Sequence, residues 1–142
     1  MLESANEMAL GIGEEVSGSV KKFVELMNTR AQQLGCTNTH FNNCNGLPDP
    51  AHVVSARDMA LISREAIKNS MFRKIVGTVR YEIPPTNKHA DPTPLNNHHQ
   101  MISAYKGRQN LYEYCIGGKT GWTSDAGNTL VTFAEKDGMT LI

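Results

Sequence analysis

The 142-residue sequence has no excess of charge of either sign and no long apolar run. Fourteen basic residues balance fourteen acidic ones, so the composition gives no electrostatic basis for binding nucleic acid or an anionic membrane. No apolar stretch approaches the roughly 20 residues of a transmembrane helix. Met1-Leu2-Glu3 does not begin a signal peptide, which needs a basic segment followed by an apolar one. With 39% hydrophobic and 20% charged residues, the composition is that of a globular domain.

Cysteine and histidine are scarce, and their spacing is not that of a metal site. Cys36, Cys44 and Cys115 form no C-x-x-C pair, and three thiols cannot all be joined in pairs within one chain. Cys36 and Cys44 could form a disulfide, but three small buried thiols are the interpretation we favour. The five histidines show no H-x-x-x-H spacing, so we expect no zinc site.

The N-terminal half has the periodicity of helices. Apolar residues recur at three- and four-residue steps over Val20–Leu34, which predicts a helix capped by Ser17 or Ser19. A second helix is predicted to begin at Ser55, with Asp58 as the partner in a capping-box-like pair. The residues that this helix is expected to bury are Met59, Ile62 and Ala66.

The C-terminal half changes to the period of strands. Residues Thr78–Ile83 alternate as a strand. Two further strands, Asn128–Glu135 and Met139–Ile142, are joined by Asp137-Gly138, which is a strong hairpin signal. The segment 84–99 is rich in proline and asparagine, and we predict a loop that cannot lie inside a sheet, because proline does not donate to a strand ladder.

Two short motifs near opposite ends of the chain carry the chemistry. Ser4-Ala5-Asn6 has the form S-x-N, and Lys119-Thr120-Gly121 has the form K-T-G. Alone, each motif is weak, because S-x-N often marks a helix cap and a lysine between glycines often lies in a solvated turn. Together, S-x-N followed by K-T-G on the last strands of a mixed domain are the second and third signatures of the penicillin-recognising serine enzymes.

Further stretches make this resemblance specific. They are Asn38–Phe41, Asn45–Leu47, Ser55–Met59 and the block from Gly118 to Met139. From Met1 to Ile142 the sequence resembles the low-molecular-mass D-alanyl-D-alanine carboxypeptidases. The resemblance implies an α/β (α+β) fold of the β-lactamase/transpeptidase-like type, with a helical subdomain followed by part of an antiparallel sheet. Residues 1–142 would form part of one catalytic domain, mainly helical over 1–76 and with the K-T-G sheet over 77–142.

The resemblance also implies a role for each residue of the K-T-G strand. Lys119 would supply a positive field beside the reacting groups, and the Thr120 hydroxyl would bind the terminal carboxylate of D-alanine. Gly121, without a side chain, would let the substrate lie against the strand as an added partner. The backbone N–H of Trp122 would be an oxyanion-hole donor. The Trp122 side chain could equally be a core anchor.

The remaining expected site residues precede this strand. Ser4 would relay a proton to the leaving amine, and Asn6 would hydrogen-bond the substrate amide and orient a catalytic lysine. The segment 97–102 resembles an N-x-N-x-L-L stretch of the family, with His99 at the second Asn. Two interpretations stay open: His98 or His99 faces the substrate carboxylate, or both are loop histidines in water.

No S-x-x-K tetrad, which carries the nucleophile in this family, precedes Ser4. Ser19-Val20-Lys21-Lys22 fits the letters but follows S-x-N, and we interpret it as a helix start with solvated lysines. Neither Met1 nor Ile142 resembles a natural boundary. We therefore expect the nucleophile in a segment N-terminal to Met1, and we expect residues 1–142 alone to be inactive.

The expected function is the penicillin-sensitive removal of the terminal D-alanine from peptidoglycan pentapeptides through an acyl-enzyme. The partners would be the stem peptide and β-lactam antibiotics, and no nucleic acid, metal or cofactor would be needed. The enzyme would lie outside the cytoplasm, in the cell envelope of a bacterium. One alternative is a class A β-lactamase, which needs a glutamate for deacylation. The only comparable segment is Glu25–Asn28, inside the first predicted helix. The other is a degenerate, non-catalytic relative that binds cell-wall peptide.

Overall fold

The structure is a computed structural model that describes all of residues 1–142. Its internal contacts divide the chain into two compact units, which we describe separately. The sheet unit consists of Met1–Ser4, Asn69–Gly121 and Thr129–Ile142, and the helical unit of Ala5–Lys68 and Trp122–Asn128. None of the helices combines the length and apolarity needed to cross a membrane.

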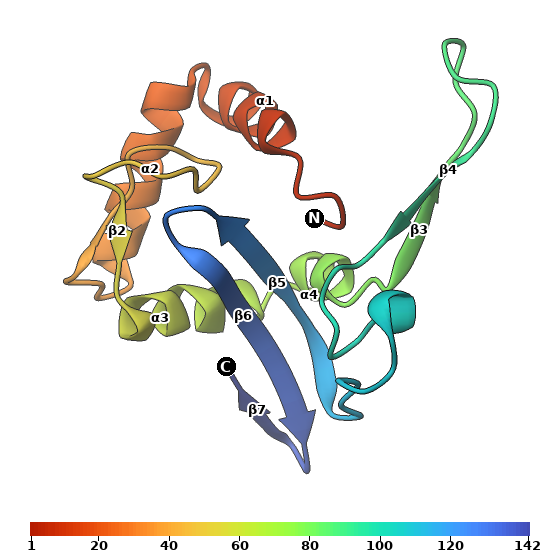
Figure 1. Ribbon diagram of the computed structural model, residues 1–142. Coiled ribbons are helices and arrows are strands. Elements are labelled where there is room, and N and C mark those ends of the chain that lie inside the picture. The colour runs from red at the N-terminus through yellow and green to blue at the C-terminus, as the bar shows by residue number, and fades with distance from the viewer. The chain divides into compact units, whose positions relative to one another are not determined.

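The helical unit contains three helices and a minimal sheet (Figure 1). Its elements are α1 (Asn6–Ser17), α2 (Val20–Gln33), β1 (Thr39–His40), β2 (Val53–Val54) and α3 (Ala56–Ala66), and β1 pairs antiparallel with β2. The predicted helix α2 is confirmed. Ser19, and not Ser17, is its cap, because the Ser19 hydroxyl accepts from the backbone N–H of Lys22 at 3.3 Å.

Helix α1 lies within the region 1–76 that is predicted to be mainly helical, although no separate helix was assigned before Val20, and Gly11 and Gly13 lower its helix propensity. Packing explains one of them. A Cβ at Gly13 would lie 3.0 Å from the ring of Phe23 on α2, so the missing side chain leaves room for the two helices to approach. A requirement of tertiary packing is therefore met at the expense of local propensity.

Asp58 on α3 is 1% exposed and ties the segment before β1 to the helix. The Ser55 hydroxyl accepts from the Asp58 N–H at 3.1 Å, as the predicted cap requires. The prediction that Asp58 completes a capping box is wrong. Its carboxylate does not return to the Ser55 N–H but accepts from the Thr39 hydroxyl and the Asn38 N–H, both at 2.7 Å. These donors, the Thr39 hydroxyl first, lower the pKa of Asp58 although burial opposes them.

The apolar face of α3 is less buried than the sequence predicts. The residues expected to be buried are only half-buried, namely Met59, Ile62 and Ala66. The buried residues of the helix are Asp58 and Ser63.

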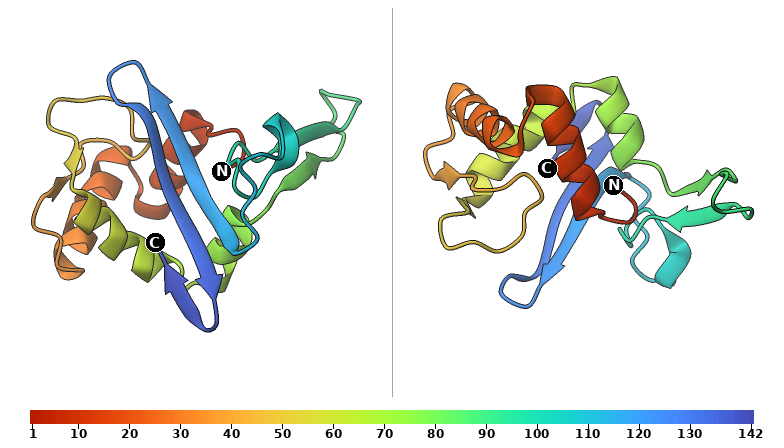
Figure 2. Two further views of the ribbon diagram at one scale, coloured as in Figure 1. Left: turned by 60° about the horizontal axis from the view of Figure 1, so that its bottom comes forward. Right: turned by 90° about the horizontal axis from the view of Figure 1, so that it is seen from above.

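The sheet unit contains one helix, a 3₁₀ turn and two antiparallel sheets (Figures 1 and 2). Its elements are α4 (Ser70–Val76), β3 (Arg80–Ile83), β4 (Thr93–Asn96), the 3₁₀ helix η1 (Ala104–Lys106), β5 (Cys115–Thr123), β6 (Gly127–Lys136) and β7 (Met139–Leu141). β3 pairs with β4, and the other sheet has the order β5-β6-β7. The end of β5 and the start of β6 are assigned to the helical unit.

Strand β4 contradicts the prediction that segment 84–99 cannot enter a sheet. Thr93–Asn96 pairs antiparallel with β3, and Pro94 lies opposite Glu82. The pair is two-stranded, so each strand has a free edge, and a proline there removes no necessary ladder bond. The predicted hairpin is confirmed: Asp137 (φ 50°) and Gly138 (φ 78°) form the left-handed turn that joins β6 to β7.

The core of the sheet unit lies between α4 and β6. Phe133 and Val76 are buried, and the Phe133 ring meets Phe72 edge-on with ring centroids 6.0 Å apart. An ion pair between Arg73 and Glu135 joins the same two elements. Phe133 and Glu135 are two residues apart on β6 and therefore point to the same face of the strand. This face packs against α4.

All three cysteines are free thiols, so the alternative of a disulfide between Cys36 and Cys44 is wrong. Cys36 is buried, as expected, whereas Cys44 and Cys115 are only half-buried. Burial is the main cause that raises the pKa of the Cys36 thiol.

Candidate active site

Lys119 and Ser4, from the two ends of the chain, meet in the sheet unit. The Lys119 Nζ donates to the Ser4 Oγ at 2.8 Å, across 115 residues of sequence. The same amine also donates to the carbonyl of Thr120. Lys119 lies half-buried in β5, so the ordinary alternative of a lysine in a solvated turn does not hold. The structure thus brings the S-x-N serine and the K-T-G lysine into direct contact.

The backbone of Ser4 is strained. Its φ is 53°, and Asp137 is the only other non-glycine residue with positive φ. Asp137 has its turn to explain it, whereas serine is not a residue that favours this region. Nor does Ser4 cap α1, because the N-cap is Ala5, which offers no side-chain hydrogen bond. Such strain costs about 1–3 kcal/mol and clusters at functional sites.

The environment of Lys119 suits it to proton transfer. Burial lowers the pKa of the Lys119 amine. A positive amine at hydrogen-bond distance favours negative charge on neighbouring oxygens, and the Ser4 hydroxyl beside it can both accept and donate a proton. Lys119 and Ser4 can therefore stabilise a developing anion and pass a proton.

The residues after Lys119 continue β5. Thr120 and Gly121 are half-buried, and a Cβ at Gly121 would lie 2.5 Å from the Thr129 Oγ1 on β6. Packing between the strands therefore requires Gly121 in addition to any role in binding. Trp122 is 70% exposed, so the alternative that its side chain is a core anchor is wrong. Asn6 is the half-buried first residue of α1 and belongs to the helical unit.

The two neighbouring histidines have different environments. His98 is half-buried, and its ring stacks on Tyr105 with centroids 6.5 Å apart. His99 is 1% exposed, and its two ring nitrogens are within hydrogen-bond distance of the Met101 N–H and the Thr132 hydroxyl. Burial lowers the pKa of His99. Both sequence interpretations are therefore wrong for His99, which neither lies in water nor has a free nitrogen for a substrate.

Sequence reasoning missed a second stretch with the letters S-x-x-K, Ser103-Ala104-Tyr105-Lys106, which a scan of the letters would have found. Its serine is buried and caps η1 by accepting from the Tyr105 N–H at 3.3 Å, while Lys106 is exposed. The stretch at Ser19 is likewise a helix cap followed by exposed lysines. Neither stretch has the arrangement of a nucleophile with its base.

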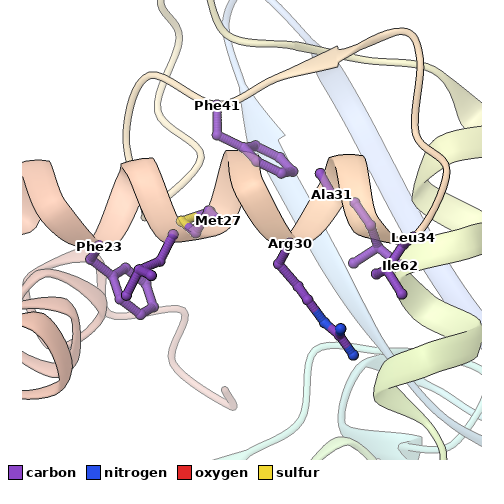
Figure 3. A pocket seen from close by; sticks show the side chains of 8 residues that line it. Phe23, Met27, Arg30, Ala31, Leu34, Phe41 and Ile62 are labelled. Atoms are coloured by element: carbon purple, nitrogen blue, oxygen red, sulfur yellow. The ribbon is translucent and has the colours of Figure 1, made fainter.

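A separate apolar hollow of about 330 Å³ lies in the helical unit (Figure 3). It is lined by Phe23, Leu26, Met27, Arg30, Ala31, Leu34, Phe41 and Ile62. Arg30 is its only charged residue and pairs with Glu65 at 2.9 Å. The hollow therefore contains no nucleophile and no acid–base pair.

Comparison with known proteins matches the whole chain to one family. The family model described as D-alanyl-D-alanine carboxypeptidase matches residues 1–142. The chain is 34% identical over 141 residues to D-alanyl-D-alanine carboxypeptidase DacF of Bacillus subtilis (strain 168), which covers 99% of this chain and 34% of the relative. It is 33% identical over 135 residues to the D-alanyl-D-alanine carboxypeptidase of Streptomyces sp. (strain K15), covering 93% and 44%. The chain thus spans less than half the length of these relatives.

Solved structures share the fold. D-alanyl-D-alanine carboxypeptidase from Mycobacterium tuberculosis H37Rv superposes with a TM-score of 0.79 at 29% identity, over 96% of this chain and 48% of that one. The Streptomyces K15 DD-transpeptidase superposes with a TM-score of 0.72 at 34% identity, over 85% and 45%. These similarities confirm the predicted fold class, a helical region with part of an antiparallel sheet of the transpeptidase-like type.

Proposed function

Because the chain belongs to the D-alanyl-D-alanine carboxypeptidase family, we propose that the protein containing it is a serine-type enzyme that removes the terminal D-alanine from peptidoglycan pentapeptides. The observation that carries this proposal is the 2.8 Å contact between the Lys119 Nζ and the Ser4 Oγ. It joins the two motifs in one place and sets a hydroxyl that can relay a proton beside a positive amine, which acyl transfer can use. The relatives come from bacteria, and the proposed substrate places the enzyme in the cell envelope, outside the cytoplasm.

The reaction proceeds through an acyl-enzyme. A serine oxygen attacks the carbonyl between the two D-alanines, the C–N bond breaks, and the leaving amine takes a proton. The Ser4 hydroxyl delivers that proton and is reprotonated from the side of the nucleophile, with the Lys119 amine beside it. Water then hydrolyses the ester and regenerates the serine. A β-lactam acylates the same serine, which makes the enzyme penicillin-sensitive.

The remaining residues hold the substrate for this step. The Thr120 hydroxyl donates to the terminal carboxylate of D-alanine, and the positive charge of Lys119 attracts the same group. Gly121 leaves space for the peptide along β5, and the Trp122 N–H donates to the carbonyl oxygen as negative charge develops. Asn6 hydrogen-bonds the substrate amide, and His98 remains a candidate contact.

We place the nucleophile outside residues 1–142. Both S-x-x-K stretches inside the chain serve as helix caps, at Ser19 and Ser103. Ser4 acts as the relay, because a hydroxyl needs a dedicated base to attack at neutral pH and the Lys119 amine is committed to the substrate carboxylate. The 142 residues alone are therefore inactive.

The class A β-lactamase alternative has less support. It needs a glutamate that activates water for deacylation. Glu25, the candidate that the sequence offers, lies exposed in the middle of α2. A relative that only binds cell-wall peptide would not need the strained Ser4 beside a lysine of lowered pKa.

We expect the full-length gene product to release D-alanine from an N-acylated peptide ending in D-Ala-D-Ala, and benzylpenicillin to stop this release. The measurement is a D-alanine assay with a chromogenic cephalosporin tested in parallel. Rapid, repeated hydrolysis of the cephalosporin without D-alanine release would indicate a β-lactamase. Inactivity toward both would support the binding-only alternative.

A further inference from the structure

His99 lies in a short loop of buried polar residues between β4 and η1. The Asn97 Oδ1 accepts from the His99 N–H, and its Nδ2 donates to the carbonyl of Thr78, both at 2.9 Å. The carbonyl of His99 accepts from the N–H of Ser103 at 3.0 Å. Asn97 and Ser103 are themselves buried. The backbone on both sides of His99 is therefore fixed, and so is the position of the Cα atom that carries the ring.

The ring connects this loop to the K-T-G sheet. Its Nδ1 is 3.2 Å from the Met101 N–H and must accept, so the proton is assigned to Nε2, which donates to the Thr132 Oγ1 on β6 at 3.0 Å. The Thr132 hydroxyl can in turn donate to the carbonyl of Gly117 on β5 at 3.4 Å. Hydrogen bonds thus lead from the loop through the neutral ring to the backbone of β5.

The ring also lies directly against β5. A Cβ at Gly118 would be 2.4 Å from the carbonyl oxygen of Val131 on β6, 2.5 Å from the His99 Cδ2 and 2.6 Å from the His99 Nε2, so glycine at this position lets both the neighbouring strand and the imidazole approach the β5 backbone. A Cβ at Gly117 would be 2.8 Å from the carbonyl of Val76, at the end of α4. Successive strand residues point to opposite faces, so β5 is held on both faces just before Lys119.

We propose that His99 is a positioning residue of the active site: its contact with Gly118 and its hydrogen bond to Thr132 fix the place of Lys119. The quantity that it controls is the 2.8 Å distance between the Lys119 Nζ and the Ser4 Oγ. A displacement of about 1 Å in such a site can cost roughly 10²-fold in rate. The inference rests on the proposed function, since it assigns His99 a role in that reaction.

The positioning requires a neutral imidazole. Burial holds the pKa of His99 below its usual value of about 6.5, so the neutral form predominates above that value. As the pH falls through the lowered pKa, a proton on Nδ1 would face the Met101 N–H, and the ring loses its place. The titratable residues on the two packed strands are Cys115, Lys119, Glu135 and Lys136. Of these, Glu135 pairs with Arg73 and Lys136 lies over Tyr114.

The experiment measures acylation of the full-length gene product by benzylpenicillin from pH 5 to 8, as both a rate constant and a final stoichiometry. His99→Ala should lower the rate constant roughly 10- to 100-fold while the molecules that fold still react to completion. His99→Gln keeps an amide donor for Thr132 and does not titrate. It should therefore restore most of the rate constant, and it should abolish the part of the fall in rate constant at acid pH that is due to protonation of His99. His89→Gln is the matched control: His89 is an exposed histidine in the segment between β3 and β4, outside the proposed site, and this variant should behave as wild type.

A wild-type rate constant in His99→Ala, even with reduced stoichiometry, would show that His99 only supports folding and would overturn the inference. An unchanged acid profile in His99→Gln would do the same. If the wild type itself is not acylated, the proposed function fails, and amide hydrogen exchange then decides the positioning. Exchange at Lys119 should rise about tenfold in His99→Ala while Thr140 on β7 is unchanged, and equal protection of Lys119 in both proteins would refute the contact.

Discussion

Lys119→Ala in the full-length gene product should lower the rate of acylation by benzylpenicillin and by a D-Ala-D-Ala peptide roughly 10²- to 10³-fold. The substitution removes the amine that lies 2.8 Å from the Ser4 Oγ, and with it the positive charge beside the developing anion. Fluorescent-penicillin labelling followed over time measures the effect. Because Lys119 also attracts the ligand carboxylate, higher ligand concentration should restore only the part of the loss that comes from weaker binding, and the part that comes from the transition state should remain.

The matched control is Lys136→Ala. Lys136 ends β6 of the same sheet, and its amine lies 4.4 Å from the ring centroid of Tyr114, without a part in the proposed site. This variant should label like wild type. Lys119→Arg keeps the positive charge and should retain more activity than Lys119→Ala, although the larger guanidinium does not reproduce a lysine contact. Labelling of Lys119→Ala at the wild-type rate would remove Lys119 from the site.

Ser4→Ala should lower kcat for the peptide by roughly 10²- to 10⁴-fold with little change in KM, because a proton relay acts in the transition state. Steady-state kinetics on a D-Ala-D-Ala peptide separate the two constants. A raised KM with unchanged kcat would indicate instead that the Ser4 hydroxyl only supports the ground-state complex.

Ser4→Gly separates the chemistry of Ser4 from its strain. Glycine accepts the φ of 53° without penalty, whereas alanine keeps the strain, so Ser4→Gly should be more stable than Ser4→Ala by about 1 kcal/mol. Both variants lack the hydroxyl and should be equally slow. Wild-type turnover in Ser4→Gly would show that the hydroxyl has no part in catalysis.

The sequence predicted those elements whose signals are local. The cap at Ser19 defines α2, and Asp137-Gly138 defines the β6–β7 hairpin, because each acts within a few residues. Strand β4 was missed because Pro94 is unfavourable inside a sheet but acceptable in a two-stranded one. The bounds of helix α1 were not assigned within the predicted helical region, and Gly13 suits the neighbouring Phe23 and not the helix itself. Both cases concern residues whose choice depends on a distant partner.

The same distinction applies to the candidate site. The K-T-G and S-x-N letters identified Lys119 and Ser4, but their contact bridges 115 residues and no local pattern predicts it. The burial of His99 could not be read from a loop of polar residues, because the ring lies against β5 and hydrogen-bonds Thr132 on β6, both distant in sequence. The need for glycine at position 118 likewise depends on the His99 ring and on the carbonyl of Val131 on β6.

The most direct test of the account is intact-mass spectrometry of the full-length gene product after incubation with benzylpenicillin, followed by mapping of the modified peptide. We expect one penicilloyl group per molecule, on a serine outside residues 1–142, and no adduct on the 142-residue chain alone. A full-length protein that forms no adduct would contradict it. So would a stoichiometric adduct on Ser4, Ser19 or Ser103, because the nucleophile would then be a residue to which we assign the role of a relay or a helix cap.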